Sequence, residues 1–145
     1  MRKQTGFTLI EILVTVVVLA IGLLGLAGLQ ATALRFNSSA SQRSQATILA
    51  YDIMERIRAN SLAARCGAYG GTPEVGLDCT SVTLAETTIA NNDIAAWNGA
   101  LLISLPSPNG VIAYDGGTRI LTITIQWDDD RDGVLDQPFL VTTQL

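Results

Sequence analysis

The chain has 145 residues, which is enough for one small domain and whatever its N-terminal segment does. It contains no histidine, which removes the commonest general base, the usual nitrogen ligand of zinc and most hydrolytic triads. Nine Lys and Arg residues stand against thirteen Asp and Glu, so the chain lacks the clustered cations that bind phosphate backbones. Composition therefore argues against an enzyme and against direct binding of nucleic acid, and it indicates no cofactor.

The first long apolar segment, residues 7–29, is long enough to cross a bilayer as a helix. Arg2 and Lys3 precede it, and the positive-inside rule predicts that they stay cytoplasmic while everything after Gln30 is exported. Glu11 is the one charge inside the segment. Its carboxylate costs about 2.5–3.5 kcal/mol at the centre of a bilayer. The Phe, Leu, Ile and Val residues around it contribute about −0.3 to −0.6 kcal/mol each, so the segment is expected to insert.

Three interpretations of this segment compete. It could be a secretory signal, with Ala31-Thr32-Ala33 as the cleavage site, although the apolar run exceeds the usual length of such signals. It could be a plain membrane anchor, which leaves Glu11 unexplained. In the third interpretation a short basic leader ends at Gly6, the chain is cut before Phe7, and Glu11 becomes the fifth residue of the mature protein.

The string GFTLIE at residues 6–11, followed by an apolar stretch, resembles the prepilin signature of type IV pilins and type II secretion pseudopilins. The resemblance implies that a prepilin peptidase cuts between Gly6 and Phe7 on the cytoplasmic face and methylates the new amine of Phe7. It also divides the chain into a leader (1–6), a membrane or filament-core segment (7–30) and a head (31–145).

Glu11 then has an expected role in assembly. Cleavage creates a cationic amine in an apolar environment, where a charge is tolerated only if it is paired. In the family, the matching Glu is thought to meet the N-terminal amine of a neighbouring subunit. The alternative is a Glu that is paired within its own helix.

A single long helix is expected from about Thr8 to Asn60, because no proline occurs before residue 73. Its second half carries an apolar stripe at spacings of three and four, which predicts packing against a head: Ala46, Leu49, Ala50, Ile53, Met54 and Ile57. The stretches AIGLLGLAGLQ, RSQA (43–46) and ERIRAN (55–60) resemble PilV-type minor pilins.

Two cysteines, Cys66 and Cys79, frame twelve residues rich in Gly and other turn formers. In an exported protein this pattern favours one disulfide, and the alternative is a pair of free buried thiols. The rest of residues 61–91 is expected to be loop with at most one short strand.

The C-terminal half predicts a short helix from Asn92 or Asp93 to Leu105, followed by strands. Residues 119–127 alternate, with Leu121, Ile123, Ile125 and Trp127 on one face. Residues 111–114 and 139–145 are the expected partners, with turns at 115–117 and 128–133. The predicted fold class is α+β: a pilin fold whose long N-terminal helix packs on a small antiparallel β-sheet.

One acidic stretch could bind a metal ion. Asp128, Asp130, Asp132 and Asp136 lie around Gly133 in a pattern like the first nine positions of a calcium loop. The twelfth position is Phe139 instead of Glu, and no helices are expected on either side. Calcium is therefore a possible cofactor, and the alternative is an acidic turn that keeps a strand connection soluble.

These features predict a minor pilin that helps to prime or modify assembly of a type IV pilus and supports adhesion and twitching motility. Its expected partners are other minor and major pilins, the prepilin peptidase and the inner-membrane assembly platform. It would cross the inner membrane once with its head in the periplasm and then enter the extracellular pilus. The alternatives are a minor pseudopilin of a type II secretion system and, in another class, a calcium-binding adhesin module.

Overall fold

The structure is a computed structural model that describes residues 6–136 and 138–145. Arg2 and Lys3, with the rest of leader residues 1–5, lie outside the described residues, as does Gln137. The chain divides into two compact units, one up to Ala40 and the other from Ser41 to Leu145. Each unit is described by itself.

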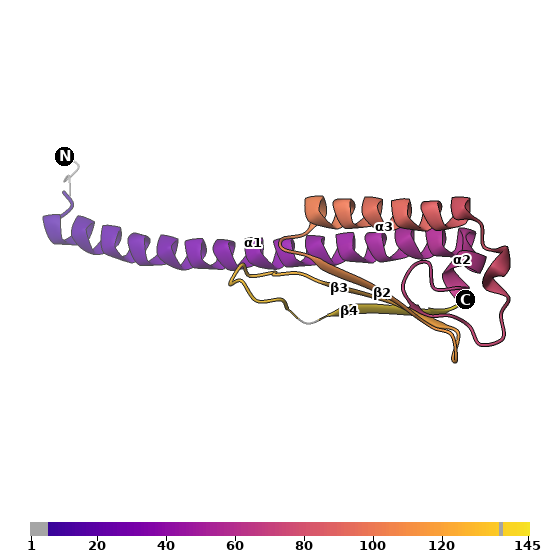
Figure 1. Ribbon diagram of the computed structural model, residues 1–145. Helices are drawn as coiled ribbons and strands as arrows, with labels where there is room; N and C mark the ends of the chain where they lie inside the picture. The colour runs from indigo at the N-terminus through magenta and orange to yellow at the C-terminus, as the bar shows by residue number, and fades with distance from the viewer. Residues whose placement is uncertain (1–5, 137) are drawn as a thin grey trace. The chain divides into compact units, whose positions relative to one another are not determined.

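The first unit consists almost entirely of the N-terminal part of helix α1, which spans Leu9–Ala59 (Figure 1). The helix begins where Glu11 N donates to Thr8 O at 3.1 Å. Every side chain from Gly6 to Ser38 is exposed. The observed bounds of α1, Leu9 and Ala59, confirm the predicted helix from about Thr8 to Asn60 to within one residue at each end.

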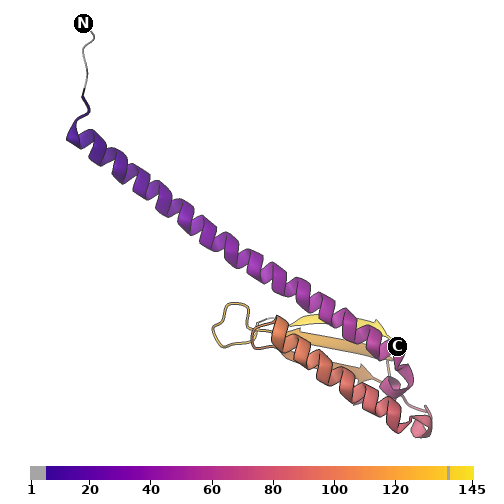
Figure 2. The same cartoon turned by 90° about the horizontal axis from the view of Figure 1, so that it is seen from above.

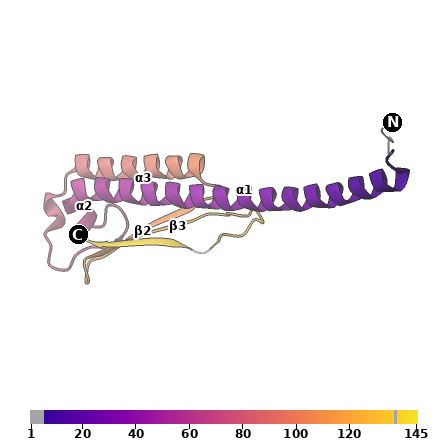
Figure 3. The same ribbon diagram turned by 180° about the vertical axis from the view of Figure 1, so that it is seen from behind.

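The second unit packs two helices on one face of a sheet (Figure 2). The second half of α1 buries five of the six residues of the predicted stripe, and Leu49 packs against the same core. Helix α3, Leu84–Ser104, runs beside it, and Trp97 Nε1 of α3 donates to Leu49 O at 3.0 Å. Figures 1 and 3 show from opposite sides that the strands lie along this part of α1.

The sheet has the order β1-β2-β3-β4. Strands β2 (Asn109–Asp115), β3 (Ile120–Gln126) and β4 (Phe139–Gln144) form the antiparallel meander that the sequence predicts. The short strand β1, Gly71–Thr72, pairs in parallel with the end of β2, so the sheet is mixed. The α+β pilin-like architecture is confirmed.

Helix α3 is longer than the sequence analysis predicts. It begins at Leu84, whereas the expected start was Asn92 or Asp93 and residues 61–91 were expected to be loop. The reason is a capping box: Glu86 N donates to the Thr83 hydroxyl, and Thr83 N donates to the Glu86 carboxylate. Residues 61–83 also contain helix α2 (Ser61–Arg65) and a 3-10 turn, η1 (Cys79–Ser81).

The core of the second unit joins both helices to the inner face of the sheet. Leu121, Ile123 and Ile125 are fully buried, and Trp127 is 5% exposed, as the strand alternation predicts. Gly110 of β2 lies directly beneath α3. A Cβ at this position would come within 2.5 Å of Leu101 and 2.7 Å of the Trp97 ring, so a larger residue would require these side chains to shift.

Polar side chains fasten the end of α1 to α3. Asn60 Nδ2 donates to the carbonyl of Glu86 at 2.9 Å, and Tyr69 OH donates to the Asp93 carboxylate at 2.6 Å. Arg56 forms ion pairs with Asp52 and Asp93. Burial, reinforced by the hydrogen bond to Asp93, raises the pKa of Tyr69 to about 12, so the phenol stays protonated as a donor.

The loop between α2 and η1 is fixed by a disulfide and by one buried carboxylate. Cys66 and Cys79 are bonded, with their Cα atoms 5.7 Å apart, so the predicted disulfide is present in the structure. Within the loop, Glu74 Oε2 accepts from Arg65 Nε at 2.6 Å, and Glu74 Oε1 pairs with Arg119 Nη2 at 2.7 Å. The hydrogen bond from Arg65 is the main cause that lowers the pKa of Glu74 below its ordinary value of 4.5.

We expect Gly110→Ala to destabilise the full chain in detergent micelles by about 1–3 kcal/mol, the usual effect of overpacking. The new methyl group would force the Trp97 ring away from its hydrogen bond to α1. Urea unfolding followed by tryptophan fluorescence measures the change.

The control is Gly99→Ala on α3, where an added Cβ meets nothing within 4 Å. Helix propensity predicts that this variant is unchanged or more stable by up to ~1 kcal/mol. Equal losses in the two variants would contradict the packing account.

We expect Glu74→Gln to lower the Tm at neutral pH, because Arg65 and Arg119 lose their anionic partner. Since the folded-state pKa of Glu74 is depressed, its contribution is complete above the unfolded-state pKa and is lost as the pH falls. The Tm difference between wild type and variant should therefore narrow below about pH 4.5. Glu55→Gln is the control, because that carboxylate pairs with Arg58 on the surface. A Tm difference that does not change with pH would rule out the assigned role of this carboxylate.

Candidate functional site

The predicted cleavage site lies in open chain ahead of the helix. Gly6 and Thr8 precede the first helical residue, Leu9, and an added Cβ at Gly6 would meet no atom within 4 Å. The Phe7 side chain is 80% exposed. A protease could therefore approach the bond between Gly6 and Phe7 from several sides, and the backbone would not have to leave a helix first.

Glu11 lies in the first turn of α1. A carboxylate is favoured there by the positive end of the helix dipole, which gives Glu11 a local stabilisation within its own helix. The Thr15 hydroxyl donates to the backbone carbonyl of Glu11, not to its carboxylate. Within residues 6–136 and 138–145, no ion pair involves Glu11. The side chain is exposed and available to a group from another molecule.

The segment around Glu11 has the length and composition of a membrane span. An 18-residue window of α1 has a mean hydropathy of 2.8, and none of it is buried within the chain. The exposed side chains include Leu13, Val17 and Leu24 at 64%, 49% and 73%. An exposed apolar surface of this extent requires lipid or other protein around it.

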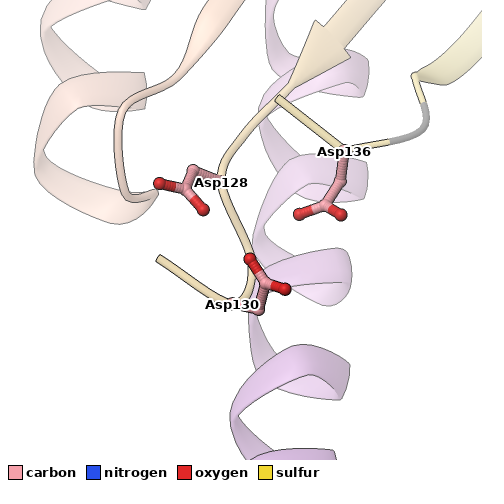
Figure 4. Close-up of side chains that lie close together, drawn as sticks. All are labelled: Asp128, Asp130 and Asp136. Atoms are coloured by element: carbon pink, nitrogen blue, oxygen red, sulfur yellow. The ribbon is translucent and has the colours of Figure 1, made fainter. Parts of the chain in front are cut away.

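The acidic loop after β3 brings three of its four predicted ligands together. Oxygen atoms of Asp128, Asp130 and Asp136 lie within 4.8 Å of one another, and Figure 4 shows that the three side chains lie close together. Asp132 does not join them. Its Oδ1 accepts from Val134 N at 2.8 Å, which holds the carboxylate in a local turn.

Backbone amides of the loop already donate hydrogen bonds to these carboxylates. Asp128 accepts from Asp132 N at 3.1 Å and from Gly133 N at 3.0 Å, and Asp136 accepts from Asp129 N at 2.6 Å. Gly133 has a φ of 86°, which suits glycine at the sharp bend. Asp130 Oδ1 also accepts from Asp132 N at 3.2 Å. The loop is thus organised by its own hydrogen bonds, and Asp130 and Asp136 are its exposed carboxylates.

Three buried or partly buried polar residues of the head form contacts that the sequence does not predict. These residues are Asn60, Glu74 and Asp93, and each has a partner that is distant in sequence. No local sequence pattern therefore predicts their contacts. The ERIRAN stretch (residues 55–60) also forms contacts that its resemblance to PilV-type pilins does not indicate. In the structure its Arg56 and Asn60 reach α3, and its Arg58 donates to Thr143 of β4 at 2.7 Å. These residues serve the packing of the head.

Comparison with known proteins identifies the N-terminal segment. No curated protein and no solved structure matches the chain significantly. Residues 1–27 match the family model described as the prokaryotic N-terminal methylation motif. The matched stretch includes Gly6, Phe7 and Glu11 together with most of the exposed apolar helix. The chain therefore begins with the N-terminal methylation motif that indicates a type IV pilin-like or pseudopilin protein.

Proposed function

We propose that this chain is a minor pilin of a type IV pilus, with a structural role in filament assembly and no catalytic one. The observation that carries the proposal is the methylation motif at the start of an exposed apolar segment of α1, whose one carboxylate, Glu11, has no ion-pair partner among the described residues. The α+β head on the second half of that helix supports the same conclusion.

The proposed mechanism starts in the inner membrane, with the head in the periplasm. A prepilin peptidase hydrolyses the bond between Gly6 and Phe7, and the Phe7 amine that this creates is methylated. The Glu11 carboxylate is costly in lipid and forms no ion pair with any described residue. Contact with the Phe7 amine of a neighbouring pilin would neutralise both charges. The subunit is thereby favoured in the filament over the bilayer.

Within this class we propose a PilV-type subunit that joins other minor and major pilins at the assembly platform. The support is the resemblance of AIGLLGLAGLQ, RSQA and ERIRAN to that type. Such a subunit would help to prime or modify the pilus and support adhesion and twitching motility. A minor pseudopilin of a type II secretion system is the alternative, because it shares the same motif. Deletion of the gene distinguishes them: the pilin's loss removes surface pili, and the pseudopilin's loss blocks secretion.

We expect Glu11→Ala to leave membrane insertion and cleavage intact while reducing incorporation into sheared pili at least tenfold. Removing the carboxylate makes insertion easier and leaves Gly6 and Phe7 unchanged, but it deprives a neighbouring amine of its partner. Mass spectrometry of the mature N-terminus should find methylated Phe7 in both wild type and variant. Immunoblots of the sheared fraction measure incorporation.

Asp52→Ala is the matched control, since it removes an exposed carboxylate from the same helix outside the motif. It should incorporate normally. A wild-type chain that keeps residues 1–6 in piliated cells, or that starts after Ala33, would overturn the proposal. Normal incorporation of Glu11→Ala would overturn the role of Glu11 alone.

We also propose that the acidic loop binds calcium, as the calcium-binding adhesin alternative requires. The support is the approach of the Asp128, Asp130 and Asp136 carboxylates to within 4.8 Å, since hard cations prefer several oxygen ligands. With Glu absent at the twelfth position and Asp132 turned away, affinity should be weak, about 10⁻⁴–10⁻³ M as in extracellular modules.

Titration calorimetry of the full chain in micelles should give a saturable heat with calcium chloride and a raised Tm. The double variant Asp130→Asn, Asp136→Asn should lose both effects. Asp78→Asn, in the other exposed loop, should retain them, because the Asp78 carboxylate only caps η1. The absence of heat and of a Tm shift at millimolar calcium would exclude calcium binding.

A further inference from the structure

The second unit has a cavity of about 220 Å³ beside the acidic loop. Its walls come from three parts of the chain, which are α1, the loop that follows β3, and the start of β4. The lining residues are Arg43, Trp127, Asp129, Asp136, Pro138 and Phe139. Pockets for drug-sized molecules measure about 300–1,000 Å³, so this cavity suits a group of the size of one amino-acid side chain.

Two of the lining residues are hydrogen-bond donors, an indole and a guanidinium. Trp127 is 5% exposed, and its Nε1–H has no hydrogen-bond partner among the described residues. A buried donor that stays unpaired costs about 1–3 kcal/mol. Arg43 forms no ion pair with any residue that the structure describes. A neutral donor and a cation in the wall of one small cavity favour a ligand with a negatively charged oxygen group.

The cavity shares one residue with the proposed calcium ligands. Asp136 lines the cavity and also belongs to the group that it forms with Asp128 and Asp130. Calcium takes about six to eight oxygen ligands, and a calcium loop completes the set with a bidentate Glu at its twelfth position. That position is Phe139 in this chain, and Phe139 lines the same cavity. A carboxylate from another molecule in this cavity would therefore lie beside the residue that replaces the missing ligand.

We propose that this cavity binds a peptide carboxylate, which a calcium ion at the acidic loop bridges to Asp136. Arg43 pairs with the ligand carboxylate, and Trp127 Nε1 donates to it. The ring of Phe139 suits the methylene groups of a Glu side chain. Without calcium, the two lining carboxylates would repel the ligand, so binding depends on the ion. The inference rests on the calcium binding proposed above, and it names the class of ligand that a calcium-binding adhesin would take.

Nuclear magnetic resonance of the isotope-labelled full chain in micelles tests the proposal, because each tryptophan indole N–H gives its own signal. Trp97 Nε1 already donates to Leu49 O and serves as the internal control. The variant Trp127→Phe assigns the two signals. The probe is N-acetylglutamate N-methylamide, which carries one side-chain carboxylate. With calcium, the Trp127 signal should move and reach saturation while the Trp97 signal stays. Without calcium, saturation should need at least tenfold more probe.

Arg43→Gln should weaken binding of the probe at least tenfold in calcium, because the carboxylate loses its cation. Arg35→Gln is the matched control, since it removes an exposed arginine of α1 that does not line the cavity. It should bind the probe as wild type does. The uncharged probe N-acetylglutamine N-methylamide should leave the Trp127 signal unchanged. N-acetylalanine carries a main-chain carboxylate, and the tighter of the two charged probes identifies the ligand as a side chain or a peptide C-terminus.

An unchanged Trp127 signal would overturn the proposal and would mean that this donor is satisfied within the chain, for example by Gln42 Oε1, a buried acceptor that also lacks a partner. Equal binding with and without calcium, or tighter binding of methyl phosphate than of either carboxylate, would overturn it as well. Calorimetry with calcium chloride separates the two proposals. Heat from calcium without a response to the probe rejects the carboxylate site alone, whereas the absence of heat rejects both.

Discussion

The N-terminal segment is constrained by one carboxylate, Glu11, which lies in an apolar stretch of helix and has no ion-pair partner among the described residues. Glu11 lies in the first turn of α1, where the helix dipole offsets part of its cost, and no described residue forms an ion pair with it. The surrounding side chains are exposed and apolar. A carboxylate at this position is costly in a bilayer, and a cation from another molecule would offset that cost, as the proposed assembly contact supposes.

The second unit is a head that is stabilised by packing on the other half of the same helix. Its core uses small residues on α1, such as Ala46 and Ala50, so that α3 and the sheet can approach closely. Polar groups then fix the ends: Asn60 and Arg56 join α1 to α3, and Glu74 joins the disulfide loop to Arg119 beside β3. The N-terminal segment and the head thus have different requirements, and the division at Ala40 separates them.

Much of this was predictable because hydrophobic periodicity is local. The stripe from Ala46 to Ile57 and the alternation from Leu121 to Trp127 were located correctly, since each depends on its own stretch of chain. The start of α3 was wrong because the capping box at Thr83 and Glu86 was overlooked, although the sequence TLAE contains it. The pairs of Glu74 and Asp93 could not be predicted, because their partners are close only after folding. At the acidic loop, the spacing predicted four ligands. Asp132 lies apart from the other three, because its carboxylate accepts a hydrogen bond from Val134 N.

The bond between Cys66 and Cys79 ties the stability of the head to the compartment that contains it. The bridge closes a loop of about a dozen residues, a constraint that contributes about 3 kcal/mol where thiols are oxidised and nothing where they are kept reduced. The loop also positions Glu74 for its two arginines. A head held in the reducing cytoplasm would therefore be looser and more open to proteolysis than one that has reached an oxidising space. The final stability of the head would thus depend, through a single covalent bond, on the redox state of the compartment that contains it.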